Sequence, residues 1–241
     1  MNNREDPEIY TGMKTGLNRE KRTAAVMIVA LACGMFMALI DVTLTSKFVL
    51  RSLAEIILFL ACPLIYARFD RGAELKRFLR PDVKKLAWPA ALCTVLFGAV
   101  MAVYFLNRDI FDFSTLANAF LEHIGVPANM FTAGGLYIAV VSSVTEEFFF
   151  RGFVFFLLKE NASRKFAYIF SATVYAAYHS AMITGWFDTW LFLLMMAGLI
   201  AESVTLNFID DVSGSVYPSW IVHIVFNLSV YVTGLSTIGS M

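Results

Sequence analysis

Long apolar runs dominate this sequence and leave few folds open to it. A helix needs about 20 mostly apolar residues to cross the hydrocarbon core of a bilayer, and most of the runs approach that length. A lone strand would leave backbone groups without hydrogen-bond partners in lipid, so we expect every run to be helical. The sequence therefore predicts an all-α fold, a polytopic transmembrane helix bundle of about seven to eight spans. The runs cover residues 23–43, 52–67, 86–106, 133–158, 166–183, 186–208 and 217–235.

The composition agrees with a membrane protein and argues against a nucleic-acid partner. Hydrophobic residues make up 59% of the 241 residues and charged residues only 16%, whereas about 25% are charged in an average soluble domain. Lysine and arginine total 19, but none follows Lys165. The sequence contains no folded soluble domain with a basic face, which a nucleic-acid partner would require. The cysteines lie singly inside apolar runs, which indicates core residues rather than disulfides or metal ligands: Cys33, Cys62 and Cys93.

The basic residues predict how the chain is oriented in the membrane. A polar tail, residues 1–22, precedes a single transmembrane domain, residues 23–241. Basic residues gather in the tail, after the second run (68–85) and after the fourth run (159–165). These segments alternate as expected for a multi-pass protein of the cell membrane whose N-terminus is cytoplasmic. Residues 107–130 then lie outside, and we expect part of them to form an amphipathic helix on the membrane or a re-entrant eighth segment.

Three charged residues lie inside the fourth run, in the stretch SSVTEEFFFRGFVFFLL. An ionisable residue near the bilayer centre is costly, so it is a candidate functional residue by default. Glu147 and Arg151 are four residues apart and share one helix face, which predicts a structural ion pair. Glu146 points roughly 140° away from Arg151. It therefore needs a partner from another span.

Polar residues on two other runs can supply that partner. His179 lies in the fifth run, four residues after Tyr175, and His223 lies in the last run, four residues before Asn227. Each pair projects from one face of its helix. Such residues can simply hold transmembrane helices together, but two carboxylates, two histidines and an amide on separate spans exceed what that role needs. We therefore predict a catalytic site between the fourth, fifth and last spans.

This set of side chains suits the hydrolysis of a peptide bond. A carboxylate beside a neutral histidine can remove a proton from water, and a histidine with an amide can stabilise the oxyanion of a tetrahedral intermediate. No covalent nucleophile is required. A competing interpretation places Glu146, His179 and His223 around a zinc ion as three ligands with an open fourth position. The HExxH, GxSG and GxGD motifs of other intramembrane proteases are absent.

Three motifs of the sequence together resemble those of a known family. Residues EEFFFR (146–151) match EExxxR, YAAYH (175–179) resembles FxxxH with tyrosine in place of phenylalanine, and HIVFN (223–227) matches HxxxN. In this order they resemble the CAAX protease and bacteriocin-processing family of intramembrane proteases, also called CPBP or Abi. The resemblance covers about residues 130–232, which we predict to be a protease-like core. The first two spans are similar only in being hydrophobic.

The resemblance implies a catalytic set of Glu146, Glu147, His179, His223 and Asn227, supported by Arg151 and Tyr175. Glu146 would activate the attacking water with help from His179. His223 and Asn227 would form the oxyanion hole. Family members are described as glutamate-dependent or as metal-dependent. We expect a site without a cofactor, with zinc as the alternative, because His223 and Asn227 suit a pair of hydrogen-bond donors better than metal ligands.

The resulting hypothesis is an intramembrane endopeptidase of the CAAX type that hydrolyses a hydrophobic, lipidated or membrane-associated peptide or protein. We expect the substrate to enter from the cytoplasmic half of the bilayer, and an accessory membrane protein could present it. Two alternatives stay open. One is a proton-coupled transporter, for which buried Glu, His and Arg are also expected. The other is a non-catalytic bacteriocin-immunity or peptide-binding protein.

Two further acids lie in apolar runs outside the motifs. Glu202 either faces the cavity and binds substrate or lies near the end of its span, where it meets water, and we favour the second. Glu55 follows Arg51 by four residues, and we expect these two to form a structural ion pair.

Overall fold

The computed structural model describes residues 17–44, 47–70, 72–80, 87–108, 131–185 and 188–238. Every long element in these ranges is a helix, so the all-α class is confirmed. The predicted amphipathic segment falls in residues 109–130 and most of the predicted tail in residues 1–16, both outside the described residues. Five helices are single elements: α1 (Arg19–Thr43), α4 (Ala87–Asn107), α9 (Arg164–Ile183), α10 (Thr189–Ser213) and α11 (Tyr217–Ile238).

Two further rods change from α-helix to π-helix and back along their length. The first consists of α2 (Phe48–Ile56), the π-helical η2 (Ile57–Ala61) and α3 (Cys62–Phe69). The second, which we call the central rod, consists of α6 (Phe131–Tyr137), η6 (Ile138–Ser142), α7 (Ser143–Glu146), η7 (Glu147–Phe155) and α8 (Phe156–Asn161), of which η6 and η7 are π-helical. A short 3-10 turn, η3 (Leu75–Arg77), follows α3. Segments of π-helix are rare and occur frequently at functional sites.

The rods of the described residues coincide with the apolar runs of the sequence. Five are long and apolar enough to cross a membrane, which indicates a multi-pass membrane protein: Arg19–Thr43, Phe48–Phe69, Trp88–Asn107, Thr189–Ser213 and Tyr217–Ser236. The central rod, which carries Glu146, Glu147 and Arg151, and α9 are not among them. The predicted number of seven to eight spans is therefore not confirmed.

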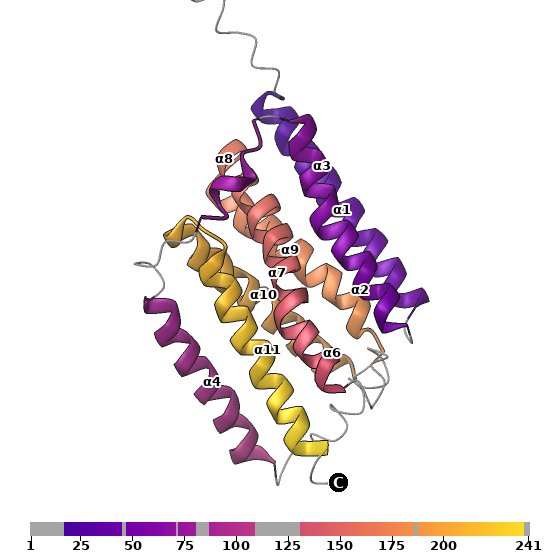
Figure 1. Ribbon diagram of the computed structural model, residues 1–241, viewed down its shortest axis with the longest axis vertical. Helices are drawn as coiled ribbons and strands as arrows, with labels where there is room; N and C mark the ends of the chain where they lie inside the picture. The colour runs from indigo at the N-terminus through magenta and orange to yellow at the C-terminus, as the bar shows by residue number, and fades with distance from the viewer. Residues whose placement is uncertain are drawn as a thin grey trace, which may run out of the picture.

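The central rod and α9 lie in the interior of the bundle (Figure 1). The α1–α3 layer covers them on one side, and α10 and α11 cover them on the other, with α4 packed on the outside of α11. All nine residues of η7 are buried. At the other end of the central rod, α6 approaches α11 closely because Gly135 has no side chain; a Cβ there would lie 2.3 Å from the ring of Tyr231. Charges on the central rod are thus shielded from lipid by protein.

Aromatic packing explains why the charged stretch of the sequence is so rich in phenylalanine. Phe59 of η2 stacks on Phe149 with ring centroids 4.4 Å apart, and its edge meets the rings of Phe150 and Tyr178. These rings are almost fully buried between η2, η7 and α9. Rings of this size supply much of the apolar contact area in a core, so this cluster fixes the central rod against its neighbours.

Capping residues define the ends of the helices around the predicted site. The Ser163 hydroxyl accepts from the backbone N–H of Phe166 at the start of α9, and the Asp188 carboxylate accepts from that of Leu191 at the start of α10. These are N-caps that satisfy otherwise unpaired donors. Helix α10 ends at Gly214, whose φ of 72° suits glycine. The buried Asp210 carboxylate then accepts from the backbone N–H of Ser219, in the first turn of α11.

The basic segments of the sequence meet at one end of the bundle. Arg22 at the start of α1 binds Asp70 after α3, with Nε–Oδ2 and Nη2–Oδ1 distances of 2.5 and 2.9 Å. Arg22 also donates to Asn161 at the end of α8. On the same side, Arg164 and its neighbour Lys159 form ion pairs with Asp211 of α10. We call this the basic end of the bundle.

Asp70 is the centre of these contacts and lies outside the candidate spans. Burial raises the pKa of Asp70, but hydrogen bonds from the Arg22 guanidinium and the Gly72 backbone outweigh it and hold this pKa below its ordinary value. A carboxylate with a depressed pKa contributes stability above its unfolded-state pKa of about 3.9, and this contribution is lost as the pH falls through the folded-state value.

We predict that Asp70→Asn lowers the stability of the protein by about 1–3 kcal/mol near neutral pH, because the Arg22 guanidinium loses its charged acceptor. The measurement is thermal unfolding of both proteins in detergent at several pH values. The difference between them should shrink below about pH 4, where the wild-type carboxylate takes up its proton. A difference that does not change with pH would contradict this assignment.

Candidate active site

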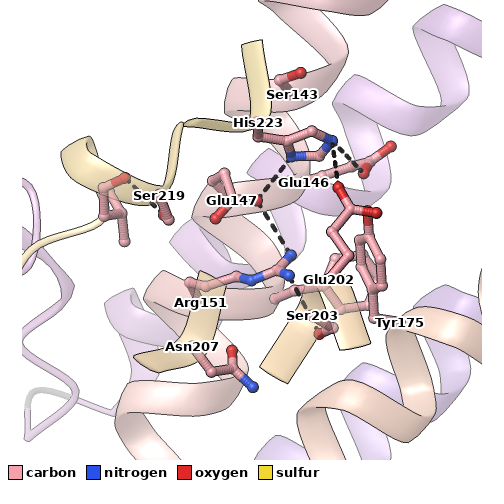
Figure 2. Close-up of polar contacts among 12 residues, drawn as sticks. Ser143, Glu146, Glu147, Arg151, Tyr175, Glu202, Ser203, Asn207, Ser219 and His223 are labelled. Atoms are coloured by element: carbon pink, nitrogen blue, oxygen red, sulfur yellow. Dashed lines mark hydrogen bonds and ion pairs between the residues drawn. The ribbon is translucent and has the colours of Figure 1, made fainter. Parts of the chain in front are cut away.

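Adjacent glutamates leave the central rod in different directions at the junction of α7 and η7 (Figure 2). Glu146 is 6% exposed and Glu147 is fully buried. Successive residues of a helix point about 100° apart, so the two carboxylates reach different neighbours. Glu147 is directed towards Arg151 and α11, whereas Glu146 faces a cavity.

Glu147 is held by two partners, one on its own rod and one on α11. Its Oε1 atom lies 3.1 Å from Nη1 of Arg151, as the four-residue spacing predicts. The same atom lies 2.8 Å from Nδ1 of His223 on α11, which therefore donates to the carboxylate. Arg151 is fully buried, donates to the Ser203 hydroxyl of α10 at 3.2 Å, and lies 4.5 Å above the ring of Tyr175 on α9. Four helical segments thus converge on one buried ion pair.

Glu146 faces the two histidines without bonding directly to either. Its Oε2 atom lies 3.7 Å from Nε2 of His179 and 4.0 Å from Nε2 of His223. Both distances are too long for a hydrogen bond, and Oε2 has no hydrogen-bond partner in the described part of the chain. The Nδ1 atom of His179 lies 3.0 Å from the Tyr175 carbonyl oxygen. Because a carbonyl only accepts, Nδ1 carries the proton, and Nε2 of a neutral His179 is an acceptor directed at Glu146.

These groups line a cavity of about 650 Å³. Glu146, His179, His223 and Asn227 all contribute to its wall, which otherwise consists mainly of methionine, phenylalanine and other apolar side chains. The Asn227 amide also donates to the Ser143 hydroxyl at 3.0 Å, which fixes its orientation. Glu147 and Arg151 are not part of the cavity wall and lie behind it. The described structure therefore brings the predicted residues together and divides them into a cavity-lining set and a buried supporting pair.

Two acids that were placed away from the site also line this cavity. The expectation that Glu202 meets water near a span end is wrong: α10 continues to Ser213, so Glu202 lies mid-helix, with Oε1 3.9 Å from Nε2 of His223. Glu55, which was expected to pair with Arg51, also reaches the central rod. Its Oε1 atom accepts from the Ser142 hydroxyl at 2.6 Å. In both cases the sequence feature that could have indicated a place in the cavity was a lone acidic residue in an apolar run.

Arg51 also has a partner that its sequence spacing did not predict. Its guanidinium lies 2.8 Å from the Asp41 carboxylate on α1. Both residues line the cavity and are almost fully buried. The turn between α1 and α2 brings them together, so this part of the wall comes from the first two helices.

Zinc stays the alternative to a site without a cofactor, and the observed donor atoms are more widely spaced than zinc ligands. Ligands around tetrahedral zinc lie about 2.0–2.1 Å from the metal, and so roughly 3.3 Å from one another. The Oε2 atom of Glu146 is 3.7 and 4.0 Å from the two histidine nitrogens. Within the described residues, no three His, Cys, Asp or Glu side chains are grouped so that they could hold a metal ion. The cofactor-free site stays a prediction, and no step is assigned to a metal.

Comparison with protein families tests the resemblance that the motifs suggested. The family model of the type II CAAX prenyl endopeptidase Rce1-like proteins matches residues 128–229. The resemblance to the CAAX protease family is confirmed over these residues. No curated protein and no solved structure matches the chain. The CAAX protease segment contains all three motifs, from Glu146 to Asn227, whereas α1–α4 lie before it.

We predict that Glu147→Gln and Arg151→Met each destabilise the protein by about 3–5 kcal/mol, because each leaves a buried charge without its partner. The double variant should be less destabilised than the sum of the two single variants, since it removes both charges. Unfolding midpoints in detergent give this comparison. Strictly additive losses would show that the two side chains do not depend on each other.

Proposed function

We propose that this protein is an intramembrane endopeptidase of the CAAX type, in which Glu146 activates a water molecule. One observation carries the proposal: the Oε2 atom of Glu146 faces two histidine nitrogens in a cavity of about 650 Å³ and has no hydrogen-bond partner within the described residues. A buried carboxylate oxygen without a hydrogen-bond donor is energetically unfavourable. Such a group is rare in native structures and is often explained by a catalytic role. The family match supports the class of reaction.

The proposed reaction uses the two histidines differently. Water lies against Oε2 of Glu146 and the free Nε2 of His179, and Glu146 takes its proton while the water oxygen attacks the carbonyl carbon of the peptide bond. The electrons of the broken O–H bond form the new C–O bond. The carbonyl oxygen becomes an oxyanion. When this intermediate collapses, the C=O bond re-forms and the C–N bond breaks, and its electron pair takes the proton back from Glu146, so that an amine and a carboxylic acid are released. His179 thus orients the water, whereas His223 faces the developing charge.

His223 is suited to stabilise that charge. Its Nδ1–H is held by Glu147, so Nε2 is directed at the cavity. The carboxylates of Glu146, Glu147 and Glu202 surround the ring and stabilise a protonated His223, which can donate through Nε2. The Asn227 amide has a second N–H besides the one that binds Ser143. Two donors at fixed positions are what an oxyanion hole requires.

The shape and lining of the cavity favour an apolar peptide as the substrate. Its wall includes Met37, Met195, Leu199 and Phe226 beside the polar groups. A hydrophobic, lipidated or membrane-associated peptide or protein would bury apolar surface there. An accessory membrane protein that presents such a substrate stays part of the proposal. A non-catalytic peptide-binding protein and a proton-coupled transporter are the alternatives that the first experiment below separates from it.

The location of the cavity changes the proposed side of substrate entry. Its wall includes the first residue of α2, Phe48, the last residue of α9, Ile183, and Gly234 near the end of α11. These positions lie at the end of the bundle opposite the basic end (Figure 1). The basic end is the cytoplasmic one by the distribution of Lys and Arg. We therefore propose entry from the other, extracytoplasmic half of the bilayer instead of the cytoplasmic half.

We predict that Glu146→Gln reduces cleavage at least about 100-fold, because the amide cannot take the proton from water. Wild type, Glu146→Gln and the exposed control Glu20→Gln are expressed in matched cells at equal membrane levels. Mass spectrometry then compares the released peptides and the new termini. Products that form with wild type and with Glu20→Gln, but not with Glu146→Gln, support a protease. Identical profiles in all three would favour the binding or transport function.

We predict that a cysteine in the cavity is labelled from outside the cell. Met182→Cys lines the cavity at the end of α9, and Glu160→Cys at the basic end is the matched control. Both are made in a background without the three native cysteines and treated with a membrane-impermeant maleimide. Intact cells should label Met182→Cys, and Glu160→Cys should react only after permeabilisation. The opposite pattern would return substrate entry to the cytoplasmic half.

A further inference from the structure

A third carboxylate is connected to Glu146 through one hydroxyl group. Glu55 of α2 is 6% exposed, and its Oε1 atom accepts from the Ser142 hydroxyl of η6 at 2.6 Å. The same hydroxyl oxygen lies 3.3 Å from Oε1 of Glu146, one helical turn further along the central rod. Glu55, Ser142 and Glu146 all line the cavity. We call these three residues the carboxylate bridge.

The carboxylate bridge has two carboxylates as acceptors but only one hydroxyl hydrogen between them. A serine hydroxyl has one hydrogen, so it can donate to only one carboxylate at a time. The shorter distance assigns that hydrogen to Glu55. The oxygen atoms of Ser142 and Glu146 then meet with no hydrogen between them when both carboxylates are ionised. A proton taken up by Glu146 removes its negative charge and relieves this repulsion.

We propose that Glu55 is a positioning residue for Glu146. By taking the Ser142 hydrogen, Glu55 leaves Oε1 of the ionised Glu146 facing an oxygen atom without a donated hydrogen, while Oε2 faces His179 and His223. The negative charge of Glu55 also favours the transfer of a proton to Glu146. This inference rests on the proposed function, because it concerns the step in which Glu146 takes a proton from water.

The contribution of Glu55 comes from outside the part of the chain that matches the CAAX protease family. Helix α2 precedes residue 128, where the match begins. A purely structural Glu55 would need only a cation on its own side of the bundle, whereas its hydrogen bond with Ser142 reaches across to the central rod. Other charged or titratable groups face the carboxylate bridge: Asp41 of α1, Arg51 of α2, Tyr137 of α6, Glu147 of η7, Tyr178 and His179 of α9, Glu202 of α10 and His223 of α11.

The kinetic test measures kcat and KM with the substrate peptide identified by the Glu146→Gln comparison. Glu55→Gln and Ser142→Ala should each lower kcat roughly tenfold, the size expected when one charged hydrogen bond is lost, and leave KM within about twofold. The stabilisation is gained as Glu146 is protonated, so it acts on the reaction rather than on substrate binding. The Glu55→Gln/Ser142→Ala double variant should be no slower than the slower single variant, because both changes remove one connection.

Two variants control this comparison. Ser142→Thr keeps the hydroxyl and should retain kcat within about threefold of wild type. Thr145→Val removes a buried hydroxyl beside Glu146 that bonds only within its own helix, to the Val141 carbonyl, and should behave like wild type. An additive double variant, or a change in KM alone, would overturn the assignment of Glu55.

A chemical measurement tests the same inference without cleavage. Dicyclohexylcarbodiimide reacts with protonated carboxyl groups in apolar surroundings, and mass spectrometry reads its attachment at Glu146. Glu55→Gln should slow this reaction several-fold near neutral pH, and Thr145→Val should not. Equal rates would overturn the proposal. If wild type cleaves no peptide but Glu55→Gln still slows labelling, the proposed function fails while the link between Glu55 and Glu146 stands.

Discussion

The buried ion pair of Glu147 and Arg151 is the interaction on which the arrangement of the site depends. A guanidinium removed from water is costly unless a carboxylate and further hydrogen-bond acceptors surround it. Here the carboxylate comes from the same rod, the hydroxyl of Ser203 from α10 and the aromatic face of Tyr175 from α9. The second bond of Glu147 goes to His223 on α11. Moving any of these four segments leaves a charge or a donor unsatisfied, so the pair fixes where both histidine helices lie.

Adjacent glutamates acquire different functions from this arrangement because their neighbours differ. Glu147 is neutralised by Arg151 and by His223, which leaves it little capacity to act on a substrate. Glu146 has two ring nitrogens at 3.7 and 4.0 Å and no hydrogen bond to Oε2 within the described residues. A base must be able to gain a proton during the reaction, and a carboxylate already held by an arginine gains one poorly. In the proposed mechanism, the pairing of Glu147 therefore leaves Glu146 as the base.

The helices and the motif residues could be predicted from the sequence because both depend on the spacing of residues along the chain. Apolar runs give helices in any bilayer-like surroundings, and a four-residue separation puts Glu147 beside Arg151 and His179 beside Tyr175. Glu202 and Glu55 reach the cavity only through the packing of α10 and α2 on the central rod, which no local pattern encodes. Arg51 shows the difficulty: an acid lies four residues after it, but the turn between α1 and α2 supplies Asp41 as well. The side on which the cavity lies depends on the same non-local packing.

The position of the central rod inside the bundle explains how it can carry three charged residues. A helix that faces lipid cannot carry Glu146, Glu147 and Arg151 without a large cost, but a helix enclosed by other helices meets protein on every side. The α1–α3 layer therefore does more than complete the bundle. By separating η7 from lipid, it permits the charges that the site requires, and through Asp41, Arg51 and Glu55 it forms part of the cavity wall. The CAAX protease segment supplies the motifs, and the helices before it supply the surroundings in which those motifs can be buried.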